Sequence, residues 1–136
     1  MISKDDIRWK QRFENLKLAY KHLKNAVDDN LKMPNNDTMR MGLIQAFHIA
    51  FELCWKTMKD YLESNAIDVQ LSRDAIKHAF KHGIIADGAI WIQMLNDRNI
   101  LAHTYDLEKT TETIKYIADT YILHIHELCE FFEKKM

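Results

Sequence analysis

The chain has 136 residues, of which 47% are hydrophobic and 29% are charged, and its net charge is −1. A domain usually has about 100–200 residues, so we expect residues 1–136 to form a single domain. With only 3 glycines and 1 proline, the chain lacks the turn residues of an all-β sandwich or barrel. The hydrophobic content excludes a disordered chain, and the net charge argues against a protein that grips nucleic acid mainly through a basic excess.

Two long helices are predicted in the first half of the chain, over residues 5–31 and 38–64. Each has apolar side chains at the three-four spacing of a helix with one buried face. These side chains are Phe13, Leu16, Tyr20, Leu23 and Val27, followed by Ile44, Phe47, Phe51, Cys54, Met58 and Tyr61. Pro34 and the Asn/Asp cluster around it end the first helix, because they favour a turn.

A short third helix is predicted from Ser72, as its N-cap, to Gly83, which suits a left-handed residue after the helix. Ala75, Ile76, Ala79 and Phe80 are expected to face inward. His78 and His82 have the spacing of a metal-binding pair, but the pattern offers no third ligand. We therefore expect both on the solvated side of this helix.

A fourth helix is predicted over residues 87–102, with Asp87 as its N-cap, and a fifth from after Asp106 to the C-terminus. The buried stripe of the fifth helix is Leu107, Ile114, Ile117, Tyr121, Ile125, Leu128 and Phe132. The predicted fold is therefore all-α: an antiparallel up-down bundle of four long helices plus one short helix.

The cellular setting is expected to be the cytoplasm. Cys54 and Cys129 are isolated, without a C-x-x-C pair, and the first residues contain no apolar segment typical of a signal peptide. No apolar stretch approaches the ~18 residues that a membrane span needs. No metal and no cofactor are expected, because the sequence has no phosphate-binding glycine loop and no complete set of metal ligands.

Arg98 is the most informative residue of the fourth predicted helix. Trp91, Met94, Leu95 and Leu101 define the inward stripe of this helix, and Arg98 falls near its middle. A guanidinium on an apolar face is costly unless it has a partner or lines a cleft. Glu52 is a candidate partner, although it is also placed to pair with Lys56 at i,i+4.

His103 follows Arg98 by five residues, where the helix is expected to end, with Asn99 and Tyr105 close by. Arg73 and His78 have the same spacing, but His78 is expected to point away from the stripe. We therefore take that second pair as accidental. Taken alone, the Arg98 cluster also fits an arginine and a histidine with purely structural roles.

The segment Arg98-Asn99-x-x-x-His103-x-Tyr105 resembles the motif of HEPN domains, in particular the HepT group, and is also similar to the family of nucleotidyltransferase substrate-binding proteins. The likeness extends to residues 45–47, 51–62, 79–85 and 91–95, and covers roughly residues 9–130. It implies a HEPN-like helical bundle that forms a homodimer. The likeness also implies a partner protein, a minimal nucleotidyltransferase made as a separate chain. It also implies a toxin that cleaves RNA without metal, and an antitoxin that modifies Tyr105 with AMP.

Metal-free RNA cleavage needs a base, an acid and a cation for the phosphorane charge. The expected catalytic residues are His103 for proton transfer, Arg98 as a phosphate clamp and Asn99 to orient either group. One chain carries one such histidine, so a dimer would supply both acid and base. The expected ligand or substrate is RNA or a nucleotide. Binding to DNA or to a membrane is not expected.

Two alternatives use the same residues. The first is a non-catalytic nucleotide-binding or substrate-binding subunit of a nucleotidyltransferase, in which Arg98 and His103 only bind phosphate. The second is a helical scaffold that docks a partner. The sequence does not separate these from the ribonuclease, since phosphate binding and phosphoryl-transfer stabilisation use the same groups.

Overall fold

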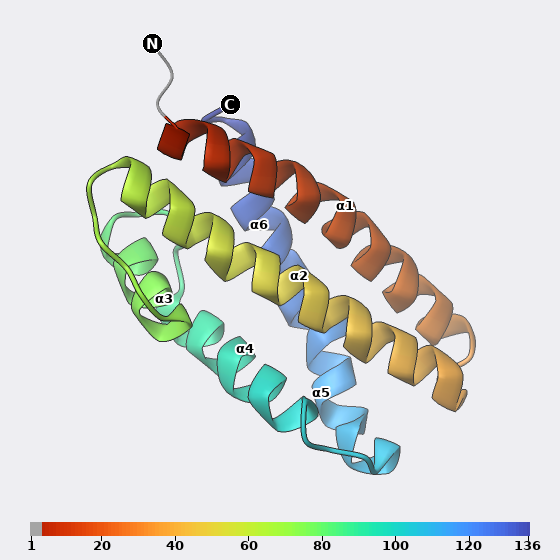
Figure 1. The fold of residues 1–136 in the computed structure, drawn as a ribbon. Helices are drawn as coiled ribbons and strands as arrows, with labels where there is room; N and C mark the ends of the chain where they lie inside the picture. The colour runs from red at the N-terminus through yellow and green to blue at the C-terminus, as the bar shows by residue number, and fades with distance from the viewer. Residues whose placement is uncertain (1–3) are drawn as a thin grey trace.

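The computed structural model describes residues 4–136, and within them every regular element is helical (Figure 1). The elements are α1 (Lys4–Lys32), α2 (Asp37–Ser64), α3 (Ser72–Lys81), α4 (Gly88–Leu101), the 3₁₀ turn η1 (Leu107–Thr110), α5 (Thr111–Tyr116), the π-helical turn η2 (Ile117–Tyr121) and α6 (Ile122–Glu133). Successive long helices run up and down, with α2 between α1 and α4 and with α3 in the connection from α2 to α4. The predicted all-α bundle is confirmed.

Local chemistry explains most of the helix ends. The Asn36 side chain accepts a hydrogen bond from the Met39 backbone N–H at 2.9 Å, and Asp87 caps α4 by accepting from Ile90 N–H at 3.1 Å. Gly83 has a φ of +76°, as predicted for a residue that ends a helix. The predicted Ser72 cap is wrong: Leu71 occupies the N-cap position of α3, which has no side-chain cap, and Ser72 begins the helix.

The predicted apolar stripes form one shared core. Trp91, Phe51, Phe47 and Tyr121 are among its largest fully buried side chains, and they link α4, α2 and η2. Phe51 lies 6.2 Å from the Trp91 ring, and Phe47 stacks on Tyr121 with ring centroids 5.8 Å apart. The site helix α4 is therefore held against α2 and the C-terminal helices by aromatic packing.

Two predictions for α3 are wrong. Phe80 is 55% exposed, because the buried face of this short helix is Ala75, Ile76 and Ala79 and Phe80 lies at its edge. There its ring covers Gly88, where a Cβ would approach Phe80 Cγ to 3.1 Å. His78 is half-buried rather than solvated, and its Nδ1 has no hydrogen-bond partner among the described residues.

The fifth predicted helix is interrupted by the turns η1 and η2. A π turn adds a residue to the helical repeat, and in this region both Tyr121 and Ile122 are buried. The Tyr121 hydroxyl donates to the Asp97 carboxylate and accepts from Gln93 Nε2 at 2.8 Å. The pKa of Tyr121 is raised, mainly by burial and to a lesser extent by the hydrogen bond to Asp97. This network fixes α4 one residue before Arg98.

In the part of the chain that the structure describes, no helix is both long enough and apolar enough to cross a membrane.

Replacing Phe51 with alanine should lower the free energy of unfolding by about 3–5 kcal/mol, because a fully buried ring is removed between α2 and α4. Urea denaturation followed by circular dichroism measures the change. Leu18→Ala, on the exposed side of α1, is the matched control and should stay within about 0.5 kcal/mol of the wild type. Equal midpoints for Phe51→Ala and the wild type would contradict this core assignment.

Candidate functional site

The residues singled out by the sequence gather at the C-terminal end of α4, opposite α2. Arg98 is in the last turns of α4 and Asn99 follows it, whereas His103 and Tyr105 belong to the segment between α4 and η1. Leu101 is buried, and its carbonyl accepts from Thr104 N–H at 3.3 Å. This anchor keeps the segment beside the helix from which it emerges.

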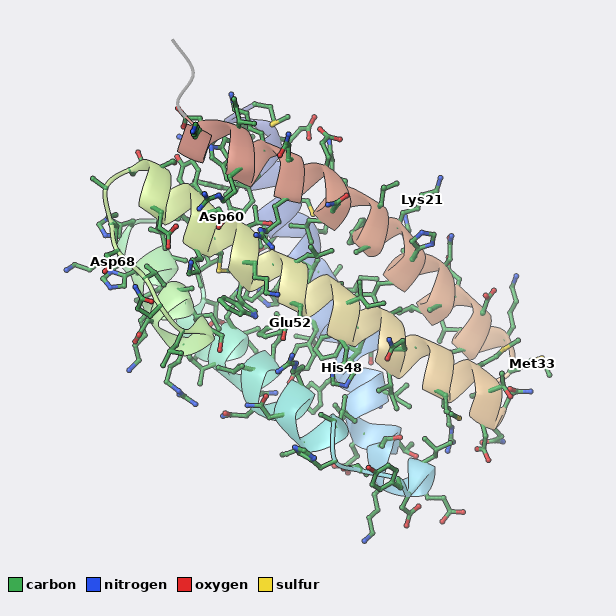
Figure 2. The ribbon with its side chains drawn as sticks, in the orientation of Figure 1. Lys21, Met33, His48, Glu52, Asp60 and Asp68 are labelled. Atoms are coloured by element: carbon green, nitrogen blue, oxygen red, sulfur yellow. The ribbon has the colours of Figure 1, made fainter. Side chains whose placement is uncertain are left out.

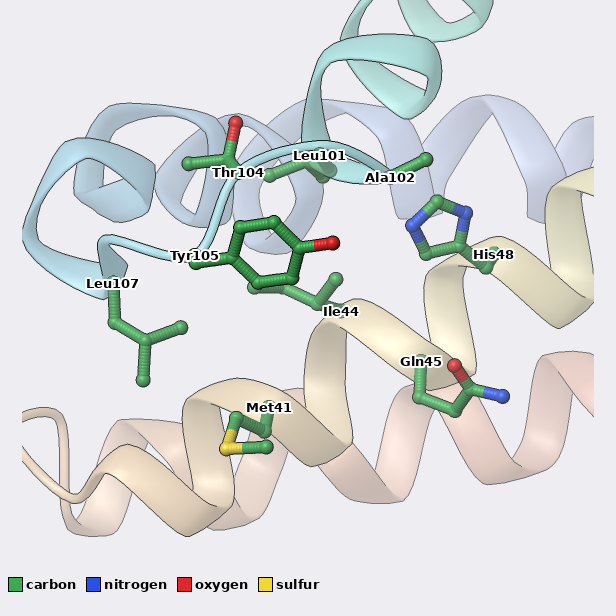
Figure 3. Close-up of a pocket in the computed structure, with 9 residues that line it drawn as sticks. All are labelled: Met41, Ile44, Gln45, His48, Leu101, Ala102, Thr104, Tyr105 and Leu107. Atoms are coloured by element: carbon green, nitrogen blue, oxygen red, sulfur yellow. The ribbon is translucent and has the colours of Figure 1, made fainter.

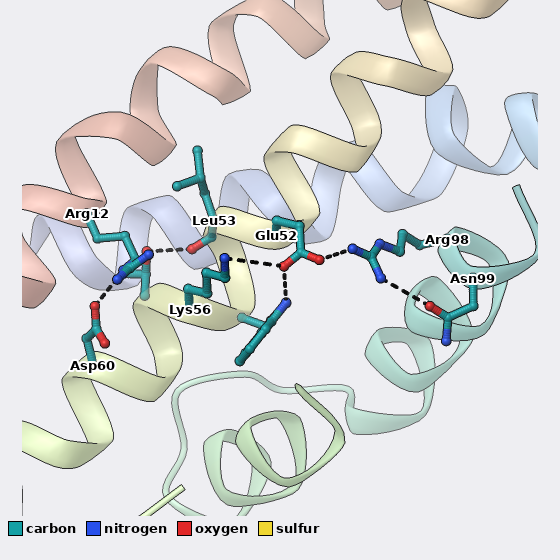
Figure 4. Close-up of polar contacts among 9 residues, drawn as sticks. Arg12, Glu52, Leu53, Lys56, Asp60, Arg98 and Asn99 are labelled. Atoms are coloured by element: carbon teal, nitrogen blue, oxygen red, sulfur yellow. Dashed lines mark hydrogen bonds and ion pairs between the residues drawn. The ribbon is translucent and has the colours of Figure 1, made fainter. Parts of the chain in front are cut away.

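Arg98 is held by an ion pair to Glu52 of α2 (Figure 4). Its Nη2 donates to Glu52 Oε1, and its Nη1 donates to the neighbouring Asn99 Oδ1 at 3.2 Å. The two charged side chains are 27% and 29% exposed, so the pair is largely shielded from water. Arg98 Nε is buried and has no partner in the described chain. The inward arginine of α4 thus has the partner that its position requires.

Glu52 is oriented by more than Arg98. Its Oε2 accepts a hydrogen bond from the Trp55 indole N–H at 2.6 Å, and Lys56 Nζ lies 4.0 Å from the same oxygen. Both contacts proposed for Glu52 from the sequence, to Arg98 and to Lys56, therefore occur together. Trp55 and Lys56 of α2 hold one oxygen of the carboxylate, and the other oxygen holds the Arg98 guanidinium.

Asn99, His103 and Tyr105 are exposed, and Tyr105 is 93% exposed. Tyr105 borders a groove of about 530 Å³ between α2 and the 102–107 segment (Figure 3). The groove is lined by Met41, Ile44, Gln45, His48, Leu101, Ala102, Thr104, Tyr105 and Leu107. Ala102 and Thr104 flank His103 in sequence, so His103 lies between two residues that line the groove.

His48 is a candidate that the sequence analysis missed. It lies on α2 one turn before Glu52, lines the groove, and is half-buried. Burial and, to a lesser extent, the Arg98 charge lower the pKa of His48 below its usual range. In the sequence, the i,i+4 spacing indicates only that His48 and Glu52 share one face of a helix. That face becomes a candidate site because α4 brings Arg98 against Glu52.

Together these groups suit phosphodiester chemistry. A guanidinium of fixed orientation can bind a phosphate, imidazoles can transfer protons near neutral pH, and an exposed phenol can accept a transferred group. Among the side chains that the structure describes, no cluster of three or more His, Cys, Asp or Glu residues is arranged to hold a metal ion.

Residues 11–134 match the model of the family described as nucleotidyltransferase substrate binding protein like. The chain belongs to this family. Among the curated relatives of this chain is the probable ribonuclease HepT of Haemophilus influenzae, which is 35% identical over 88 residues. That match covers 61% of the present chain and 60% of the relative, so it spans less than two thirds of the length of either protein.

Solved structures share the fold of this chain. A Haemophilus influenzae structure that reveals the fold of a substrate-binding domain of a nucleotidyltransferase has a TM-score of 0.76 at 29% identity, and the match covers 87% of this chain and 96% of that one. A tri-AMPylated HEPN toxin of Shewanella oneidensis, in complex with MNT antitoxin, has a TM-score of 0.77 at 15% identity, with 93% and 96% covered. The resemblance to the HepT group and its HEPN-like fold is confirmed.

Replacing Glu52 with glutamine should lower the free energy of unfolding by about 1–3 kcal/mol, because the half-buried Arg98 loses its charged partner. It should also disturb any activity that depends on the orientation of Arg98. Chemical denaturation gives the stability change. Glu63→Gln is the matched control, because Glu63 is also on α2 and ion-paired, to Lys59 at 2.8 Å, but lies away from the groove. A Glu52→Gln protein as stable as the wild type would show that the ion pair contributes nothing to stability.

Proposed function

We propose that this protein is a metal-independent endoribonuclease, the HEPN-type toxin component of a two-gene system with a minimal nucleotidyltransferase. The observation that carries the proposal is the Arg98 guanidinium, which is oriented by Glu52 and lies five residues before an exposed His103. The chain neighbours of His103, Ala102 and Thr104, line the groove. The relationship to a probable ribonuclease HepT supports the reaction class.

In this mechanism Arg98 binds the phosphate that is to be cut. Glu52 occupies Nη2 and Asn99 accepts from Nη1, and both contacts set the direction in which the rest of the guanidinium meets an anion. Positive charge beside the phosphorus stabilises the extra negative charge of the phosphorane. His103 is exposed and transfers a proton, and Asn99 orients the histidine or a phosphate oxygen.

We also propose a homodimer formed through the face that carries the motif. Met41 of α2 is exposed and lines the groove, and two further apolar side chains, Ile49 of α2 and Ile100 of α4, are exposed close in sequence to the groove residues His48 and Leu101. Side chains of this kind are typical of a protein interface. Pairing across this face would bring two copies of Arg98 and His103 together. Light scattering should give the mass of a dimer for the wild type and of a monomer for Ile100→Glu.

The proposed partner, a separate nucleotidyltransferase, would attach AMP to Tyr105. The exposed phenol is accessible to another protein's active site. Its oxygen would attack the α-phosphorus of ATP, giving a tyrosyl phosphodiester with release of pyrophosphate and loss of the phenolic proton. The added negative charge and bulk, two residues from His103, would compete with RNA for Arg98. The solved complex of an AMPylated HEPN toxin with MNT antitoxin supports this regulation.

Expression in cells that lack the partner tests the proposal. The wild type should slow growth and deplete cellular RNA, whereas His103→Ala, produced at the same level, should do neither. Normal growth and intact RNA with the wild type, with Tyr105 shown to be unmodified by mass spectrometry, would favour the alternative of a subunit that binds a nucleotide or substrate without cutting it.

A further inference from the structure

His48 is the half-buried imidazole closest in sequence to the Glu52–Arg98 pair. It is on the same face of α2 as Glu52, since the two residues are one helical turn apart (Figure 2). In Figure 3 its ring stands at the end of the groove toward which the Tyr105 hydroxyl is directed. The groove therefore has an imidazole on its α2 wall, and its opposite wall includes Ala102 and Thr104, the two chain neighbours of His103.

The surroundings of His48 suit a base rather than an acid. The charge that acts on its ring is that of Arg98 on α4, and Tyr105 of the 102–107 segment lines the same groove. Glu52, one turn further along α2, is already paired with Arg98 and Trp55. Burial and the Arg98 charge favour the neutral ring. A neutral imidazole next to a bound phosphate has a free lone pair for the proton of a nearby hydroxyl.

We propose that His48 is a second catalytic histidine, the general base of the cleavage site, with His103 as the general acid. This inference rests on the proposed ribonuclease function. The His48 ring takes the 2′-hydroxyl proton, and the 2′-oxygen forms a bond to phosphorus. The bond from phosphorus to the 5′-oxygen breaks, and protonated His103 gives its proton to that oxygen. The products are a 2′,3′-cyclic phosphate and a 5′-hydroxyl, so acid and base both come from one chain.

The test compares His48→Ala with His103→Ala on a short RNA that spans one linkage cut by the wild type. The RNA is made in two forms, one with the natural 5′-oxygen and one with sulfur in its place. A thiolate leaves without a proton, so the sulfur substrate needs a base but no acid. His48→Ala should lower kcat/KM by about 10²-fold or more on both substrates. His103→Ala should lower kcat/KM by a similar factor on the RNA with the natural 5′-oxygen, but not on the RNA with sulfur.

Imidazole added to the buffer separates a base from a merely structural residue. It should raise the rate of His48→Ala by about tenfold or more, because the emptied groove admits the free base. His22→Ala, an exposed histidine on α1, is the matched control and should behave as the wild type on both substrates. Circular dichroism melts confirm that each variant is folded, and His48→Gln, which preserves more of the side-chain volume, is measured in parallel.

The assignment of His48 is overturned if its variants cut at the wild-type rate, if imidazole fails to rescue His48→Ala, or if sulfur rescues His48→Ala instead of His103→Ala. Each of these results leaves the ribonuclease function in place, because the wild type still cuts. If the wild type cuts no RNA, the proposed function itself fails, and the role of His48 fails with it.

Discussion

Replacing His103 with alanine should reduce RNA cleavage by about 10²–10⁴-fold, the range that a single proton-transfer residue contributes. The variant should fold normally, since His103 is exposed and only its backbone has a described hydrogen bond, from its N–H to Ile100 O at 3.1 Å. Single-turnover cleavage of a labelled RNA measures the loss, and a thermal melt measures the fold.

His82→Ala is the matched control for this experiment. His82 is also exposed and also follows a helix, but it belongs to the end of α3, and neither it nor its chain neighbours line the groove. Its removal should leave the cleavage rate unchanged. A His103→Ala protein that cuts as fast as the His82→Ala control would remove His103 from the mechanism.

Replacing Arg98 with lysine should reduce kcat/KM by about 10²–10³-fold, although the charge is conserved, because removing one preorganised donor to the transition state has a cost of this size. Lysine is a point charge without the planar fork, so it cannot contact Glu52, Asn99 and a phosphate in fixed directions. The effect should appear mainly in kcat, since a lysine still attracts the anionic substrate.

Arg73→Lys is the matched control, because Arg73 has the same five-residue spacing to His78 as Arg98 has to His103. Arg73 is exposed on α3 and donates to Asn96 Oδ1 at 3.3 Å, away from the groove. Arg73→Lys should keep the kcat/KM of the wild type, so the two lysine variants should differ in kcat/KM by about 10²–10³-fold. Equal activities would mean that the arginine of the motif is only structural.

Local patterns predict most of this fold from the sequence. The three-four spacing of large apolar side chains marks the helices, and Pro34, Asp87 and Gly83 mark three of their ends, because each acts on its neighbours in the chain. No local sequence pattern of this kind predicts the π turn at residues 117–121. Tyr121 is bonded there to Asp97 and Gln93, 24 and 28 residues away, and no local pattern encodes those contacts.

The candidate site shows the same division between local and distant contacts. The inward stripe of α4 singles out Arg98, and the motif adds Asn99, His103 and Tyr105. The partner of Arg98 is 46 residues away on α2, so the sequence leaves Glu52 open between Arg98 and Lys56. His48 becomes a candidate only when α2 and the 102–107 segment form the two walls of one groove.

The central claim is that side chains of this protein cut RNA without a metal ion. The most direct measurement incubates purified wild-type protein, with Tyr105 confirmed as unmodified, with total RNA in excess EDTA. We expect cleavage at the rate seen without EDTA, and loss of cleavage with His103→Ala. RNA that stays intact in EDTA, or a His103→Ala protein that cuts as the wild type does, would contradict this account.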